Sequence, residues 1–486
     1  MKAKQTIRGW WWLPEQPDKK VPGIAEIVRG KGATLQLLEV LPFTRNGYVP
    51  VHGIPMILGE SIDGREFISL LDGYETTVSI RKYALPPDGY SHATIVARCA
   101  IVGVHLASPS VPARSVSVGF TYLNRWVNDY SSILHEYDSG VIQIVGEIGK
   151  EKVHASSDLN NGFKLELIGI VHPDDDFFNG KYGLAANAYF RICHEEGALI
   201  SDYRTLVVGL QNFLILATQR KVFATDIHVN FGGDSDGVIM AKDNRGSASV
   251  YLYHRCQRID KERFVDTGTM LFVLPQIGDS CSTILRNWLN EAPLFDLAYH
   301  LYFAVALEKN LYAENKFLSY IQAIEGYHRR VVDDDKYVPK AEFKSIVESV
   351  IAAIPEGVSS PLKASIVQSI QRANDYSLRE RLEWVLARRG SILKQTFFGN
   401  DEQCTRFVRS VVETRNYLSH ILDPSKMKNV LSIENSDFGD AIERLQILLE
   451  SCLLDVCGMG GEMIDTILMG RYDRRIVRNK VVKGSS

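Results

Sequence analysis

The apolar residues of this chain change their spacing near residue 280, and that change constrains the fold more than any other feature. Before it, short runs rich in Val, Ile, Tyr and Phe, such as "SGVIQIVGEIG" and "GFKLELIGIVH", are bounded by Gly, Asp, Asn and Pro. Runs of this kind favour strands joined by turns. After it, and up to about residue 471, apolar residues recur at helical spacing, as in "DAIERLQILLESCLLDVC". The chain therefore combines a β-rich part with an all-α part.

We expect an α+β fold with two domains. Residues 1–279 form a β-rich, sandwich-like N-terminal domain, with a barrel as the other arrangement of such strands. One helix over residues 201–221 interrupts the strands, because its apolar residues form a single stripe. Residues 280–475 form an all-α bundle of about five to eight helices. Residues 476–486 form a basic tail.

Two capping boxes mark helix starts within the all-α part. Ser377 is followed three residues later by Glu380, and Asn400 is followed three residues later by Gln403. In each pair the two side chains can satisfy backbone N–H groups that a helix leaves free at its first turn. The pattern therefore predicts helices that begin after Ser377 and after Asn400.

Composition excludes several classes of protein. Of the 486 residues, 45% are hydrophobic and 23% are charged, which is typical of a soluble globular protein. A net charge of -3 excludes the global basic field of a dedicated non-specific nucleic-acid binder, so a nucleic acid would be bound locally. The 7 cysteines are scattered without a CxxC pair. This favours free thiols in a reducing compartment over a disulfide scaffold or a zinc site.

The N-terminus lacks the apolar region of a signal peptide, and the longest apolar region, "LVVGLQNFLILA", is shorter than the roughly 20 residues that span a bilayer. We therefore expect a cytoplasmic protein with no membrane contact. The sequence contains no Gly-rich phosphate loop, GxSxG elbow or HExxH motif, which removes common NTPases, hydrolases and zinc proteases. "HPDDD" at 172–176 and "GGDSDG" at 232–237 lack the remaining ligand positions of a calcium loop. Both are interpreted as turns, and no metal site is expected.

One predicted helix carries an unusual polar face. It begins near Asp401 and ends near Asp423, because Pro424 disfavours helix at the residue before it. At about 100° per residue, its buried face contains Phe407, Val411, Thr414, Leu418 and Ile421. The opposite face contains Arg409, Glu413, Asn416 and His420, and Arg415 lies beside that stripe. A solvated face is the simplest interpretation, but Asn and His are weaker helix formers than Lys, Glu, Gln and Ala.

The stretch "RNYLSH" within this helix resembles the signature of the HEPN superfamily of small helical ribonucleases, which is an arginine, a polar residue and a histidine. Arg415, Asn416 and His420 match these three positions. Upstream, "FLSYIQAIEGYHRR" with Glu325 resembles the second helix of the ApeA-like branch of HEPN domains. The opening "GWWWLPEQPDKKVPGIAEIV" resembles the β-rich domain that precedes HEPN in those anti-phage proteins. The resemblance covers most of the chain.

The resemblance implies metal-independent RNA cleavage without a cofactor, and the residue types fit this chemistry. RNA supplies its own nucleophile, the 2′-hydroxyl, so the enzyme provides proton transfer and charge stabilisation. His420 can act as general base or acid at neutral pH. Arg415 presents a permanently charged fork to phosphate oxygens, and Asn416 can orient the imidazole or the phosphate. The implied products carry a 2′,3′-cyclic phosphate and a 5′-hydroxyl.

HEPN proteins generally pair two such helices across a two-fold interface, so the resemblance also implies a homodimer through the helical domain. The second histidine would let one site hold both a base and an acid. The implied partners are an RNA substrate, with tRNA among the candidates, and a phage-derived trigger that binds the N-terminal domain. In this view the protein is a latent nuclease of abortive-infection type. The alternative is a non-catalytic HEPN dimerisation or adaptor protein that senses a phage component.

Further residues are candidates for supporting roles. Glu325 either orients Arg415 or His420 from a neighbouring helix, or pairs with Arg329 four residues later. Glu413 and Arg409 share the polar stripe with His420. A basic C-terminal stretch is either a solvated end or an RNA contact. Its arginines are Arg471, Arg474, Arg475 and Arg478.

Overall fold

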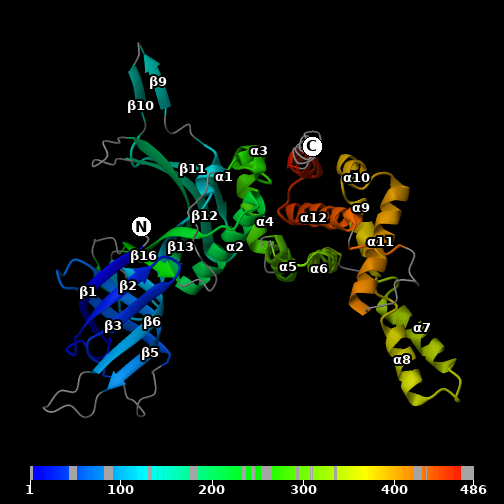
Figure 1. The fold of residues 1–486 in the computed structure, drawn as a ribbon, viewed down its shortest axis with the longest axis horizontal. Coiled ribbons are helices and arrows are strands. Elements are labelled where there is room, and N and C mark those ends of the chain that lie inside the picture. Colours follow the sequence, from blue (N-terminus) through cyan, green and yellow to red (C-terminus); the bar gives the residue numbers. More distant parts are fainter. Residues whose placement is uncertain are drawn as a thin grey trace. The chain divides into compact units, whose positions relative to one another are not determined.

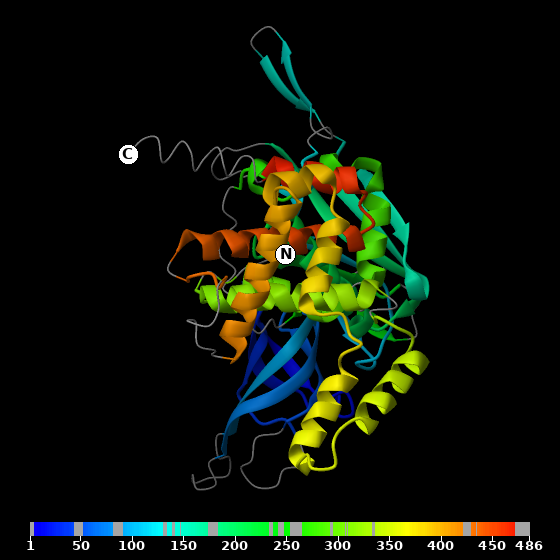
Figure 2. The ribbon, with the colours of Figure 1, turned by 90° about the vertical axis from the view of Figure 1, so that its right-hand side faces the viewer.

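The chain forms two compact units, residues 1–289 and residues 290–486. This division falls one helix later than the change in sequence pattern near residue 280. The computed structural model describes residues 4–42, 52–80, 91–129, 134–138, 141–145, 147–173, 183–232, 237–241, 247–252, 265–291, 295–306, 308, 310–332, 336–420, 429–433 and 435–471. Figures 1 and 2 show strands in the first unit and helices in the second, as the sequence predicts.

The first unit is built on an antiparallel sheet with twelve strands in its described residues. The strands are β1 (Lys4–Trp12), β2 (Val21–Val28), β3 (Gly32–Leu37), β4 (Ile54–Ser61), β5 (Phe67–Ile80), β6 (Ser91–Val102), β8 (Ala113–Phe120), β11 (Glu151–Asp158), β12 (Phe163–Pro173), β13 (Leu184–Ala198), β14 (Ala224–Asn230) and β16 (Ser247–Leu252). Their order is β11-β12-β13-β8-β14-β16-β6-β3-β2-β1-β4-β5. Smaller pairs join β9 (Leu134–Asp138) to β10 (Val141–Val145), and β7 (Val104–Leu106) to β15 (Val238–Ala241).

Part of this sheet closes into a barrel, because β6 pairs with β5 as well as with β3. The ring runs β6-β3-β2-β1-β4-β5 and returns to β6. Beyond the ring, residues 99–102 of β6 pair with β16, and from there the sheet continues open to β11. Of the two arrangements expected for these strands, the barrel is therefore the one that forms. Closure removes the free edges that an open sheet would expose there.

The tryptophans of β1 show how the barrel core is filled. Strand alternation sends Trp11 inward, where it is 0% exposed, and leaves Trp10 45% exposed. Trp12 is on the same side as Trp10 but is buried, since it packs edge-on against His105 and lies under the ammonium group of Lys20. The Trp11 ring lies directly over Gly59, its partner on β4.

Helices cover the open part of the sheet. They are α1 (Leu123–Val127), α2 (Ile200–Thr218), α3 (Leu274–Ile277) and α4 (Cys281–Glu291), with 3₁₀ turns at Asn160–Gly162, Thr267–Thr269 and Gly278–Ser280. The helix expected over 201–221 is thus confirmed as α2, which packs on β8 and β13. Trp288 on α4 is 0% exposed and donates from Nε1 to the carbonyl oxygen of Gly209 on α2 over 2.8 Å. This contact explains why α4 lies with the first unit.

The second unit contains α5 (Asp296–Ala306), α6 (Ala313–Val331), α7 (Lys340–Ala352), α8 (Ser360–Gln371), α9 (Leu378–Ala387), α10 (Ser391–Phe397), α11 (Asp401–His420), α12 (Ser436–Val456) and a helix over residues 461–471. The described residues of this unit thus form nine helices, more than the five to eight that the sequence predicts. α6 is central, since α5, α9, α11 and α12 all pack against it. α7 and α8 pack on each other, have no buried residue and extend away from the bundle (Figure 2).

Both predicted capping boxes form. The Ser377 backbone N–H donates to Glu380 over 2.7 Å, and the Glu380 N–H donates to the Ser377 hydroxyl. Asn400 and Gln403 make the same reciprocal pair, with both bonds at 2.9 Å. The first turns of α9 and α11 are therefore fixed by local side chains, as the sequence indicates.

Replacing Gly59 with alanine should destabilise the barrel, since the added Cβ would lie 2.2 Å from two carbon atoms of the Trp11 ring. Overpacking of this kind costs about 1–3 kcal/mol. Gly73→Ala is the matched control on the adjacent strand, because a Cβ there would lie 3.4 Å from its nearest neighbour, in Ile95. Thermal denaturation should show a lower midpoint for Gly59→Ala and an unchanged or higher midpoint for Gly73→Ala. Equal midpoints would mean that the Trp11 ring moves aside freely.

Candidate active site

Helix α11 positions the predicted catalytic residues. It begins at Asp401 after the Asn400 capping box and is described as far as His420, while residues 421–428 lie outside the described residues. On its predicted buried face, Phe407, Val411 and Thr414 are buried, whereas Leu418 is half-buried. Ile421 lies outside the described part of the chain. This face packs α11 against α6 and α9.

Arg415 and Asn416 interact directly. Both are half-buried, and Arg415 donates from Nη1 to Asn416 Oδ1 over 3.2 Å. Among the described residues no carboxylate forms an ion pair with Arg415. No described carboxylate therefore competes with an anion for the remaining guanidinium N–H groups, and the bond to Asn416 restricts the directions in which they point.

His420 lies one helical turn after Asn416, about 6 Å further along the axis of α11. The backbone of α11 therefore brings the three residues of the "RNYLSH" motif within two turns of one helix. The side chain of His420 lies outside the described residues.

Glu413 has a structural role that sequence reasoning missed. Its carboxylate accepts from the backbone N–H of Asn429 over 3.0 Å and from the Asn429 side-chain amide over 2.8 Å. One residue further along α11, the Thr414 hydroxyl accepts from the backbone N–H of Leu431 over 2.9 Å. These three bonds hold the returning chain against α11. Glu413 therefore serves as an acceptor for this segment, and nothing in the stretch "KNVLS" signals that contact in the sequence.

Glu325 makes neither of its two expected contacts. It is half-buried on α6, and no hydrogen bond or ion pair joins it to a described residue, including Arg415 and Arg329. α6 does pack against α11, so the carboxylate lies on a neighbouring helix without reaching the guanidinium. Arg409 is exposed on α11. Of the C-terminal arginines, Arg471 ends the last described helix, and Arg474, Arg475 and Arg478 lie outside the described residues.

A buried histidine on α6 was also missed. His328 is 0% exposed, and its Nδ1 lies 2.8 Å from Nη1 of Arg381, which is also 0% exposed. Because an arginine has only donors, Nδ1 must accept, and the ring proton of neutral His328 then lies on Nε2. Arg381 donates in addition from Nε to the carbonyl oxygen of Tyr376 over 3.0 Å. This pair joins α6 to α9 and has a structural role.

The described residues contain no group of His, Cys, Asp and Glu that would hold a metal ion. The two oxygen-rich stretches lie partly beyond them, at residues 174–176 and 233–236. Within the same described ranges, no helix is long and apolar enough to cross a bilayer.

Thr414→Val should release the returning segment, because valine keeps the shape of threonine and removes the acceptor for the Leu431 N–H. Loss of such a hydrogen bond should raise the exchange rate of that amide by roughly two- to tenfold. Hydrogen exchange of a peptide that covers residues 429–433 measures the effect. Thr405→Val is the matched control, since the exposed Thr405 hydroxyl bonds within α11 to the Asp401 carbonyl. Unchanged exchange in Thr414→Val would show that this bond does not hold the segment.

Comparison with known families agrees with the division into a β-rich part and a helical part. Residues 6–288 match the family described as ApeA N-terminal domain 1, and residues 318–461 match the family described as Apea-like HEPN. No curated protein and no solved structure matches the chain. The second match contains Arg415, Asn416 and His420, and HEPN domains are typically ribonuclease-type domains that commonly dimerise. The first match alone spans more than half of the 486 residues. The chain therefore belongs to the ApeA-like family of HEPN-domain defence proteins.

Proposed function

We propose that this protein is a latent, metal-independent RNA endonuclease of anti-phage defence, of abortive-infection type, that acts in the cytoplasm. The observation that carries the proposal is the state of Arg415. Its guanidinium is oriented by Asn416 on the helix that also carries His420, and no described carboxylate neutralises it. An arginine that is oriented and left without an acidic partner is suited to a phosphate group.

The proposed reaction breaks one P–O bond and forms another. The 2′-hydroxyl oxygen of a ribose attacks the adjacent phosphorus while His420 accepts the hydroxyl proton. Arg415 stabilises the additional negative charge on the phosphorane oxygens. The bond from phosphorus to the 5′-oxygen then breaks, and a second imidazolium protonates the leaving oxygen. The products are a 2′,3′-cyclic phosphate and a 5′-hydroxyl, and no cofactor takes part.

The second imidazolium is proposed to come from His420 of another copy of this chain. One histidine cannot easily act as base and acid within a single turnover, and two-fold pairing of HEPN domains would place two Arg415 and His420 sets in one cleft. The ApeA N-terminal domain is the proposed source of restraint, since a constitutively active ribonuclease would harm its own cell. A phage-derived trigger bound there would release the nuclease, and tRNA is a candidate substrate.

His420→Ala and Arg415→Ala should each abolish cleavage, because general acid–base catalysis alone contributes roughly 10²- to 10⁴-fold to a rate. The measurement is sequencing of all RNA ends with a 5′-hydroxyl in phage-challenged cells that carry each variant. Matched controls are His300→Ala and Arg379→Ala, two exposed residues of the same unit. We expect new 5′-hydroxyl ends in cells with the wild type or a control variant, and none in cells with His420→Ala or Arg415→Ala. The positions of these ends would also identify the RNA that is cut. Protection by the wild type without new ends would favour the adaptor function.

The oligomeric state gives a separate test. Light scattering at micromolar protein should give twice the chain mass of 54.6 kDa. When wild type is mixed with His420→Ala before assembly, activity should fall with the square of the wild-type fraction, because a mixed dimer holds one histidine only. A monomer both with and without RNA, or a linear fall in activity, would contradict the composite site.

A further inference from the structure

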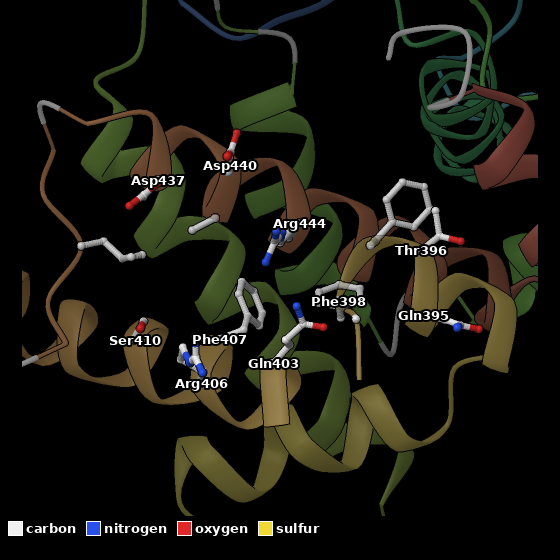
Figure 3. Close-up of a pocket in the computed structure, with 14 residues that line it drawn as sticks. Gln395, Thr396, Phe398, Gln403, Arg406, Phe407, Ser410, Asp437, Asp440 and Arg444 are labelled. Carbon is white, nitrogen blue, oxygen red and sulfur yellow. The ribbon is translucent and has the colours of Figure 1, made fainter. Parts of the chain in front are cut away.

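A cleft opens beside the first half of α11, on the N-terminal side of the catalytic motif. It has a volume of about 560 Å³ and is lined by α10, α11, Leu431 and the first turns of α12. Figure 3 shows the residues that line it, among them Asp437, Asp440 and Arg444 on α12, and Arg406, Phe407 and Ser410 on α11. Sequence reasoning gave no function to this group of residues, because they are far apart along the chain.

The inner part of the cleft is aromatic and cationic. Phe398 and Phe407 pack edge to face, with ring centroids 5.3 Å apart, and both are buried. The Arg444 guanidinium lies over the Phe407 ring, 5.8 Å from its centroid. No described carboxylate forms an ion pair with Arg444. The guanidinium therefore lies over the aromatic ring, and no described acidic residue engages its N–H groups.

The outer part carries both signs of charge. Asp437 and Asp440 are exposed on the first turns of α12, and the exposed Arg406 on α11 pairs with Glu402 over 2.9 Å. Within the described residues, Asp437, Asp440 and Arg444 form no ion pair, so two carboxylates stand beside one unpaired guanidinium. The two carboxylates would repel a simple anion, and the polar rim does not suit an apolar ligand. The arrangement instead fits a ligand with a flat ring, a row of N–H donors and a negative charge. A nucleotide has these three features.

Each feature of a nucleotide has a counterpart in the cleft. Amino and imino groups on a base edge can donate to the carboxylates of Asp437 or Asp440, as acidic side chains accept from cytosine N4 in nucleic-acid complexes. The base can stack on the guanidinium of the half-buried Arg444, which lies over the Phe407 ring. A phosphate can accept from Arg406 or from the edge of Arg444.

The cleft also lies within reach of the proposed catalytic residues along the same helix. Ser410 at its edge is ten residues from His420, which is about 15 Å along the axis of α11. Arg406 and His420 are separated by only about 40° around that axis. An RNA strand that follows this side of α11 would pass from the cleft to His420 within a few nucleotides.

We propose that this cleft is a nucleotide-binding subsite that takes one nucleotide of the RNA strand close to the cleavage position. The proposal rests on the proposed function for its choice of RNA as the source of that nucleotide. A free ribonucleotide would offer the same chemistry, and the experiment below distinguishes the two sources.

Binding is measured on the full chain carrying His420→Ala, so that RNA stays intact. Fluorescence anisotropy with a short single-stranded RNA of mixed sequence gives its affinity, and calorimetry gives the affinities of GMP and AMP. In this background Arg444→Ala should weaken RNA binding by roughly tenfold, as loss of a charge-assisted contact implies. Arg379→Ala, an exposed arginine of α9 outside the cleft, should leave it unchanged.

Asp440→Asn keeps the proposal testable if Arg444→Ala fails to fold, because Asp440 is exposed and packs in no core. It should change the relative affinity for RNAs that differ in base, since a neutral amide replaces an acceptor-only carboxylate. GMP or AMP should compete with RNA for the cleft. If GMP or AMP binds more tightly than the RNA, the ligand of the cleft is a free nucleotide. If the RNA binds more tightly, the ligand is a nucleotide of the RNA strand.

The proposal would be overturned by two results together. Arg444→Ala and Asp440→Asn would leave RNA affinity and base preference unchanged, and GMP and AMP would not bind. Its failure is separable from failure of the nuclease. If wild type produces no 5′-hydroxyl ends while the cleft variants lose affinity, the catalytic proposal fails and the subsite stands. If wild type cuts RNA while the variants bind as before, the subsite fails and the nuclease stands.

Discussion

The helical unit depends on a carboxylate buried in its centre. Glu450 on α12 is 0% exposed, and burying a charge without partners would cost several kcal/mol. Its Oε1 accepts from the Tyr302 hydroxyl over 2.9 Å and from the Gln446 amide over 2.8 Å. Because hydrogen bonds are directional, the bond from Tyr302 on α5 fixes the rotation of α12 against that helix, while Gln446 lies on α12 itself. Burial also raises the pKa of Tyr320 on α6, which keeps that neighbouring phenol in its neutral form.

A second set of polar contacts continues this arrangement along α12. Asp455 accepts from the Tyr327 hydroxyl over 2.6 Å, and Arg389 reaches both Asp455 and the Ser451 carbonyl oxygen. These bonds link α12 to α6 and to the end of α9. α11 in turn packs on α6 and α9, and Glu413 and Thr414 hold the segment that leads into α12. The orientation of α11 is thus set by polar contacts outside the RNYLSH motif, including those of Glu413 and Thr414 just before it.

Sequence patterns predicted the parts of this protein that depend on local interactions. The capping boxes at Ser377 and Asn400 need only four consecutive residues, and the stripe of α2 needs one helix, so both were predicted correctly. The closed barrel depends on β6 pairing along both edges with β3, β5 and β16, which no local pattern encodes. The contact between Glu413 and Asn429 was missed for the same reason. The sequence pattern placed Glu413 on a polar stripe of α11. In the structure its carboxylate instead accepts hydrogen bonds from Asn429, sixteen residues later.

The α7–α8 pair depends on contacts at its base. Neither helix has a buried residue, whereas Asn374, at 6% exposed, exchanges two side-chain hydrogen bonds with Val338 across the base of the pair. Lys336 and Asp375 form an ion pair beside it. These contacts join the chain before α7 to the chain after α8. Because neither helix contributes a buried residue, the core of the bundle does not depend on α7 and α8. A fluorophore or an affinity tag placed at the far end of this pair would therefore report on the molecule without disturbing the packing around α11.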